Sequence, residues 1–128
     1  MMAFLRGRAR SFQYAFAGWW LVLRTQRNAW IHAAISMAVL FLGLWLGLAA
    51  RDWAVIVLAI ALVWVAEFIN TALEAVVDLA SPELHPLAKA GKDVGAAAVL
   101  VAAGASVLVG LLILGPPLWE RVRLILSF

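Results

Sequence analysis

Three long apolar stretches dominate the sequence, and short polar breaks separate them. They run over residues 30–50, 53–80 and 93–115. A hydrocarbon core of about 30 Å needs roughly 20 helical residues, so each stretch is long enough to cross a bilayer as a helix. Membrane barrels instead use alternating segments of about 10 residues, which these unbroken stretches do not resemble. The pattern therefore predicts three transmembrane helices.

The breaks predict how these helices are connected. Arg51-Asp52 is a two-residue polar break, which predicts a tight antiparallel turn between the first two helices. Ser81-Pro82 is expected to end the second helix, with residues 81–91 forming a short loop. Gly115-Pro116-Pro117 is expected to end the third helix, leaving residues 119–128 as a tail on the outer membrane surface.

The first 27 residues have a different pattern, because polar and basic side chains interrupt the apolar ones. This segment is not a cleaved signal peptide, since no small-x-small cleavage site follows it. The pattern predicts an amphipathic helix lying in the membrane surface, and a plain surface anchor without a catalytic role fits equally well. Its polar side carries Arg6, Arg10, Gln13 and Arg24, and its apolar side Phe12, Phe16, Trp19, Trp20 and Leu23.

Composition narrows the class of protein. Hydrophobic residues make up 66% of the 128 residues and charged residues 13%, against about 45–50% and about 25% in soluble domains. A soluble enzyme and a disordered chain are thereby excluded, and the length predicts one domain over residues 1–128. The chain has no cysteine, which excludes disulfides, thiolate nucleophiles and cysteine-ligated metals. We expect an all-α integral membrane protein.

The basic residues predict the orientation. Seven of the ten lie in the N-terminal segment and the 81–92 region, and three lie on the other side of the membrane. Basic residues gather on the cytoplasmic side, so the N-terminus is expected to face the cytoplasm from the inner (plasma) membrane. The net charge of +3 fits an anionic leaflet better than nucleic acid, which is not an expected partner.

Polar side chains form one stripe on the second apolar stretch. Glu67, Asn70, Glu74 and Asp78 stand at i, i+3, i+7 and i+11, which places all four on one face of a helix. Three carboxylates on one face repel one another, so the stripe needs a metal ion or Lys and Arg beside it. A role limited to holding helices together explains one such residue better than four.

Depth suggests what the stripe does. Counting from Trp53 at about 1.5 Å per residue, Glu67 lies about 21 Å deep and Glu74 about 31 Å, at the headgroups. Lys92 and Asp93 begin the third helix at that level. A site that runs from lipid to water suits a reaction between a lipid-borne group and a soluble one.

Other motifs are less informative. His32 and His85 have no metal-ligand spacing, and His32 is interpreted as an interhelix hydrogen-bonding residue. Gly91 and Gly95 belong to a run of small residues that favours close helix packing. The sequence has no GxxxxGK[ST], so it is not a P-loop protein.

The run from Glu67 to Asp78, followed by His85 and Lys92-Asp93, closely resembles the signature of the prokaryotic diacylglycerol kinase family. That family includes Gram-negative diacylglycerol kinases and Gram-positive undecaprenol kinases, and the resemblance extends over nearly the whole chain. It implies a membrane lipid kinase that transfers the γ-phosphate of ATP to a lipid alcohol with Mg²⁺. It also implies a homotrimer with composite sites between subunits.

The resemblance assigns roles at the lipid end of the site. Glu67 would be the general base that takes the proton of the lipid hydroxyl, and Asn70 would orient it. Glu74 would bind the Mg²⁺ that bridges the ATP phosphates. Gln26 stands where the family often has a Glu that shares the metal. An amide oxygen can still coordinate Mg²⁺ or the nucleotide, but it brings no charge.

The resemblance also assigns nucleotide contacts. Lys92 would contact the β- and γ-phosphates, and Asp78 and Asp93 would support nucleotide and metal binding. Glu83 and His85 match a loop that contacts the nucleotide. Arg8 or Arg10 would reach the nucleotide from the N-terminal helix.

Two questions stay open at this level. The segment from His85 to Lys89 resembles the undecaprenol kinase loop more than the diacylglycerol kinase loop, which favours undecaprenol as acceptor. The alternative from another class is a non-enzymatic, oligomeric proton or cation pathway lined by the polar stripe. Stabilisation against heat by MgATP would separate a kinase from such a pathway.

Overall fold

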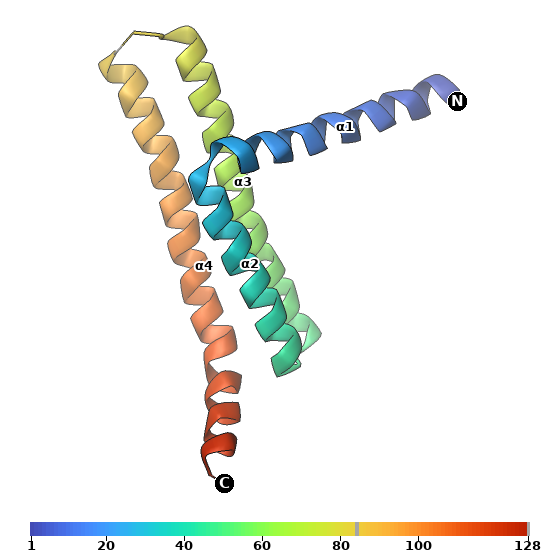
Figure 1. Cartoon of the computed structure of the whole chain (residues 1–128), viewed down its shortest axis with the longest axis vertical. Helices are drawn as coiled ribbons and strands as arrows, with labels where there is room; N and C mark the ends of the chain where they lie inside the picture. Colours follow the sequence, from blue (N-terminus) through green and yellow to red (C-terminus); the bar gives the residue numbers. More distant parts are fainter. Residues whose placement is uncertain (84, 128) are drawn as a thin grey trace.

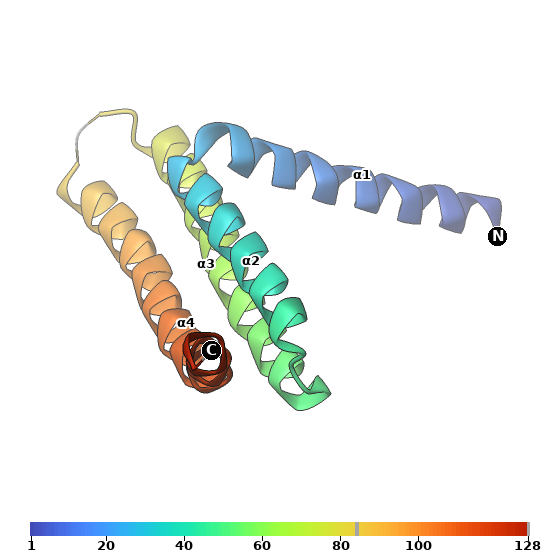
Figure 2. The same cartoon turned by 60° about the horizontal axis from the view of Figure 1, so that its bottom comes forward.

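The computed structural model describes residues 1–83 and 85–127, with only the backbone described over 2–6. All regular structure in these ranges is helical, which confirms the all-α prediction. The helices α2, α3 and α4 run side by side, and α1 projects away from them (Figures 1 and 2). Their bounds are α1 Met2–Thr25, α2 Arg27–Leu46, α3 Ala50–Ala80 and α4 Pro86–Leu126.

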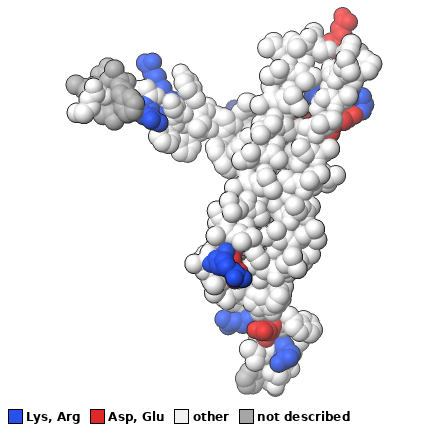
Figure 3. Space-filling view, turned by 180° about the vertical axis from the view of Figure 1, so that it is seen from behind, with Lys and Arg blue, Asp and Glu red and all other residues white. Residues whose placement is uncertain are grey.

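Three of the helices, α2, α3 and α4, are long and apolar enough to cross a membrane, as predicted. In the most apolar 18-residue segment of each of these helices, between 11% and 33% of the residues are buried within the chain. Charged side chains gather toward the two ends of the molecule and along α1, with an uncharged surface between (Figure 3). An apolar surface of this extent is stable where lipid or other membrane helices cover it.

The turn between α2 and α3 lies earlier than predicted. Gly47 adopts a left-handed conformation with φ of 69°, and the N–H of Leu48 donates to the carbonyl of Gly43 over 3.2 Å. This glycine ends α2, because other residues adopt that conformation only at a cost. Arg51 and Asp52 lie in the first turn of α3, where a carboxylate is favourable. The prediction that these two residues form the break is wrong.

The connection between α3 and α4 is shorter than predicted. Nδ1 of His85 accepts a hydrogen bond from the N–H of Leu87 over 3.2 Å, and Pro86 occupies the first helical position. Proline is favoured there because the N–H that it lacks has no partner in the first turn. The helix therefore begins at Pro86, and residues 86–91 do not belong to the loop.

The prediction that Gly115-Pro116-Pro117 ends the third helix is also wrong, because α4 continues through it to Leu126. The residue before a proline is pushed out of the helical region partly by its own Cβ, and Gly115 has none. The predicted tail is thus largely the last turns of α4, apart from Phe128, which lies outside the described residues. The guanidinium of Arg121 lies 5.8 Å from the ring centroid of Trp45 on α2.

Two sets of contacts position the polar residues of α3. The helix packs more extensively on α4 than on any other described helix, and a Cβ at Gly95 would overlap Oδ1 of Asn70. On the other side, the ring centroid of Trp19 lies 4.6 Å from those of both Trp64 and Phe68. These rings fix the C-terminal part of α1 against α3, because Trp64 stands three residues before Glu67 and Phe68 one residue after it.

Candidate functional site

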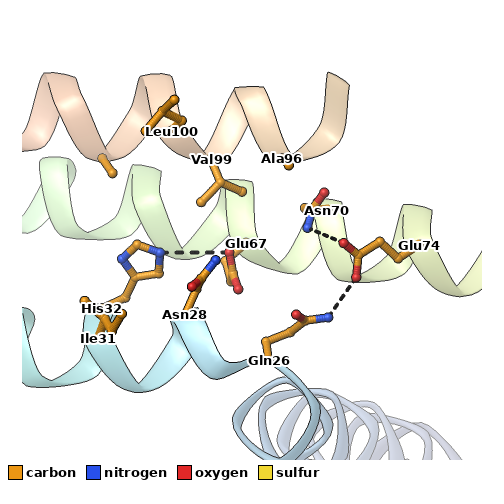
Figure 4. Close-up of a pocket in the computed structure, with 11 residues that line it drawn as sticks. Gln26, Asn28, Ile31, His32, Glu67, Asn70, Glu74, Ala96, Val99 and Leu100 are labelled. Atoms are coloured by element: carbon orange, nitrogen blue, oxygen red, sulfur yellow. Dashed lines mark hydrogen bonds and ion pairs between the residues drawn. The ribbon is translucent and has the colours of Figure 1, made fainter. Parts of the chain in front are cut away.

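A cavity of about 230 Å³ lies between α2, α3 and α4. Its polar side chains come from α2, α3 and the junction between α1 and α2, whereas α4 contributes small and aliphatic residues (Figure 4). The small residues let α4 come close enough to cover the polar groups of α3. The lining residues are Gln26, Asn28, Ile31, His32, Glu67, Asn70, Glu74, Ala96, Val99, Leu100 and Ala103.

Glu67 is the most deeply buried acid in the described part of the chain, with 2% of its surface exposed. Its Oε2 lies 3.9 Å from Nε2 of His32. Its backbone carbonyl accepts a hydrogen bond from the Thr71 hydroxyl over 2.9 Å, one helical turn on. No hydrogen bond to the carboxylate itself is made by a described residue, so this group is available to a molecule that enters the cavity.

Glu74 is held by two amide side chains. Nε2 of Gln26 donates to Oε2 over 2.9 Å, and Nδ2 of Asn70 donates to Oε1 over 3.1 Å. Gln26 stands between α1 and α2 in an extended conformation, with φ of −103° and ψ of 113°. Oδ1 of Asn70 is buried without a hydrogen-bond partner in the described structure. This oxygen packs against Gly95 of α4, where even a Cβ would overlap it.

The resemblance implies a Mg²⁺ ion, which binds oxygen ligands such as those of Glu74 and Gln26. The described residues contain no group of three or more His, Cys, Asp or Glu side chains that could hold a metal by themselves. Mg²⁺ in phosphoryl-transfer sites, however, is held by one or two carboxylates together with substrate phosphates and water. The Glu74 carboxylate fits that pattern. The amides of Gln26 and Asn70 present N–H groups to it, so the Gln26 oxygen reaches the same ion only if its amide turns over.

A second cleft, of about 580 Å³, lies at the ends of α3 and α4 that the loop connects. Nζ of Lys92 donates to Oδ1 of Asp78 over 2.6 Å, and Lys89 pairs with Asp93. Asp78 follows Glu74 by one helical turn, about 6 Å along the axis, so the cleft adjoins the cavity. Its lining residues are Val77, Asp78, Ser81, Pro82, Glu83, His85, Pro86, Ala88, Lys89, Lys92 and Asp93.

The structure thus divides the residues singled out from the sequence into two groups. Gln26, Glu67, Asn70 and Glu74 line the cavity. Asp78, Glu83, His85, Lys92 and Asp93 line the cleft. Arg8 and Arg10 line neither, and they lie on the part of α1 that projects from the other helices (Figure 1).

Sequence reasoning missed two residues of the cavity, Asn28 and His32. His32 is interpreted from the sequence as an interhelix hydrogen-bonding residue. It does contact Glu67 on α3, but no hydrogen bond forms there, because Nε2 and Oε2 lie 3.9 Å apart. A signal for both was present in their spacing. They stand four residues apart in an otherwise apolar segment, and residues at this spacing share a helix face.

Comparison with known proteins agrees with this arrangement. The chain matches the family described as prokaryotic diacylglycerol kinase over residues 13–114. It is 45% identical over 109 residues to the undecaprenol kinase of Bacillus subtilis, covering 85% of this chain and 89% of that protein. It is 48% identical over 109 residues to a diacylglycerol kinase of Synechocystis sp., covering 84% and 62%.

A third relative is the diacylglycerol kinase of Escherichia coli K12, which is 39% identical over 83 residues, or 59% of this chain and 68% of that protein. The three apolar helices and these relatives define the protein as a small membrane enzyme, a lipid kinase. The chain belongs to the prokaryotic diacylglycerol kinase family, which confirms the resemblance seen in the sequence.

Proposed function

We propose that the protein transfers the γ-phosphoryl group of ATP to the hydroxyl group of a membrane lipid alcohol. The observation that carries this proposal is the succession of three spaces along α3, an apolar groove, the Glu67 cavity and the charged cleft. An apolar groove of about 470 Å³ shares Ile31, His32 and Ala103 with the Glu67 cavity. On its other side the cavity ends at Glu74, and the charged cleft begins one helical turn further along α3 at Asp78. A lipid chain in the groove and a nucleotide in the cleft would bring their reacting ends together near Glu67.

The chemistry needs little beyond positioning and neutralisation of charge. The hydroxyl oxygen of the lipid attacks the γ-phosphorus, an O–P bond forms, and the bond from the γ-phosphorus to the bridging oxygen breaks. ADP leaves with that electron pair, and the hydroxyl proton passes to the carboxylate of Glu67. Asn70 holds Glu74 beside the reacting groups. Bound Mg²⁺, held by Glu74 and by the Gln26 oxygen after its amide turns over, would supply neutralisation of phosphate charge.

The cleft residues serve the nucleotide in this proposal. Lys92 is held by Asp78 before the nucleotide arrives, and its ammonium then contacts the β- and γ-phosphates. Asp93 is paired with Lys89 and supports the same end of α4. Glu83 and His85 contribute contacts from the loop, where His85 also caps α4. A charged cleft lined from two helices and their connection offers both cations and hydrogen-bond acceptors to a nucleotide.

We further propose undecaprenol as the preferred acceptor, because the segment from His85 to Lys89 resembles the undecaprenol kinase loop. The wide apolar surface of α2, α3 and α4 supports a homotrimer in which part of that surface packs against other subunits. The basic residues support an orientation with the N-terminus in the cytoplasm and the protein in the inner membrane. In that orientation α1 lies along the membrane surface.

The test is transfer of labelled phosphate from MgATP in mixed micelles, with undecaprenol and diacylglycerol assayed side by side. Glu67→Gln should lower kcat about 100-fold or more, because general bases contribute roughly 10²–10⁴. Glu120→Gln is the matched control, since it neutralises an exposed carboxylate near the far end of α4. A folded wild-type protein that phosphorylates neither lipid, and that MgATP does not stabilise, would overturn the proposal and favour the ion pathway.

A further inference from the structure

His32 occupies an unusual position for a histidine in an apolar helix. Its side chain is 14% exposed, and its Nε2 is fully covered without a hydrogen-bond partner in the described structure. It projects from α2 into the cavity, one turn after Asn28, toward the carboxylate of Glu67 on α3 (Figure 4). The separation of 3.9 Å between Nε2 and Oε2 of Glu67 is too long for a hydrogen bond.

Two neighbouring side chains, Ser36 and Trp64, pair with each other and leave the imidazole without a hydrogen bond from either of them. Ser36, one turn further along α2, accepts a hydrogen bond from Nε1 of Trp64 over 3.4 Å. The Trp64 ring lies edge-on to the imidazole at 6.5 Å between centroids. A buried nitrogen without a partner is destabilising, so a purely structural histidine would be a poor choice here. The position of His32 is explained if its Nε2 forms a hydrogen bond to Glu67 when a substrate occupies the cavity.

We infer that His32 is a positioning residue for Glu67. When the lipid hydroxyl enters the cavity, Nε2–H of His32 donates to Oε2 of Glu67, which turns the other carboxylate oxygen toward the hydroxyl. The required movement is about 1 Å, from 3.9 Å to an ordinary hydrogen-bond length of roughly 2.9 Å. Hydrogen bonds of catalytic groups are often long before substrate binds and shorten in the complex.

The proton balance is simple. His32 keeps its Nε2 proton throughout and acts as a donor only. The proton released by the lipid hydroxyl ends on the Oε1 of Glu67, as in the proposed reaction. The inference rests on the proposed function, in which Glu67 is the general base. It adds a residue on a second helix, so that α2 and α3 together hold the base.

The kinetic test uses two replacements of His32 in the full-length protein in mixed micelles. His32→Leu has similar bulk without a donor, and His32→Gln keeps an N–H at nearly the reach of Nε2. His32→Leu should lower kcat about 10-fold or more with an unchanged KM for MgATP, and His32→Gln should restore most of the loss. In a Glu67→Gln background, His32→Leu should cause no further loss, because the partner it positions is absent.

If the wild type is active, any of three outcomes would overturn the inference. They are an unchanged kcat in His32→Leu, equal losses of kcat in His32→Leu and His32→Gln, and a further loss of kcat when His32→Leu is added to Glu67→Gln. A wild type without kinase activity would overturn the proposed function and the inference with it. Thermal unfolding of each variant checks that the loss is not one of folding.

A spectroscopic measurement separates the contact from the activity. With lipid substrate present, ¹⁵N resonances of the His32 imidazole should report a proton on Nε2 that is hydrogen-bonded to a carboxylate. Glu67→Gln should shift these resonances, and Glu120→Gln should not. His85, the other histidine of the chain, caps α4 and serves as an internal reference. Resonances of His32 that do not respond to Glu67→Gln would overturn the inference.

Discussion

The closest approach of α4 to the candidate site is at Gly95. A Cβ at this position would overlap Oδ1 of Asn70 and would lie 3.1 Å from Cδ2 of Leu73. Gly95→Ala must therefore move the Asn70 amide or push α4 away from α3. Asn70 also donates to Glu74 over 3.1 Å, so the displacement passes directly to the second carboxylate of the site.

The magnitudes separate the effect on stability from the effect on activity. Overpacking costs about 1–3 kcal/mol, and loss of the Asn70–Glu74 hydrogen bond about 1 kcal/mol more. Alanine in place of glycine within a helix stabilises the helix by about 1 kcal/mol, which offsets part of this cost. The net destabilisation is therefore modest. Activity should fall about 100-fold, because a displacement of positioned groups by about 1 Å can cost that much in rate.

The assay is labelled-phosphate transfer with the same protein checked by thermal unfolding in detergent. Gly91→Ala is the matched control, because its Cβ would meet the nearest atom, Cγ2 of Val77, at 4.0 Å. In an Asn70→Ala background, Gly95→Ala should lower activity no further, since the clash is with the Asn70 side chain. Wild-type activity in Gly95→Ala, or equal losses in the Gly91 and Gly95 variants, would refute the reasoning.

Three further predictions follow from other contacts. Gly47→Ala should destabilise the protein by about 1–2 kcal/mol in thermal or denaturant unfolding, because the left-handed conformation at φ of 69° then carries a side chain; an unchanged midpoint would contradict this. Lys92→Met should raise the KM for ATP about 10-fold, and Asp78→Asn, which removes the carboxylate that holds the Lys92 ammonium at 2.6 Å, should raise it by a smaller factor. Gln26→Glu replaces the amide that donates to Glu74 over 2.9 Å with a second carboxylate. The melting temperature of this variant should therefore lie below that of the wild type in a chelator. Added Mg²⁺ should raise it more than it raises that of the wild type.

Much of the candidate site could be read from the sequence, because helical periodicity is local. The stripe at Glu67, Asn70 and Glu74 needs only 3.6 residues per turn to share a face, and the structure lines one cavity with all three. The same reasoning did not find His32, since its partner is on another helix. Only the packing of α2 against α3 shows that its Nε2 faces Glu67.

The sequence by itself determined that the chain is helical, that three helices are long and apolar enough to span a membrane, and which face of α3 carries the polar side chains. These properties depend on hydrophobicity and on spacing within one helix. The tertiary structure decided where the helices end and which groups meet. Gly47 rather than the charges at 51 and 52 ends α2, because the backbone conformation determines that break. Contacts between helices, such as those of His32 with Glu67 and of Gln26 with Glu74, depend on packing between distant segments, which no local pattern encodes.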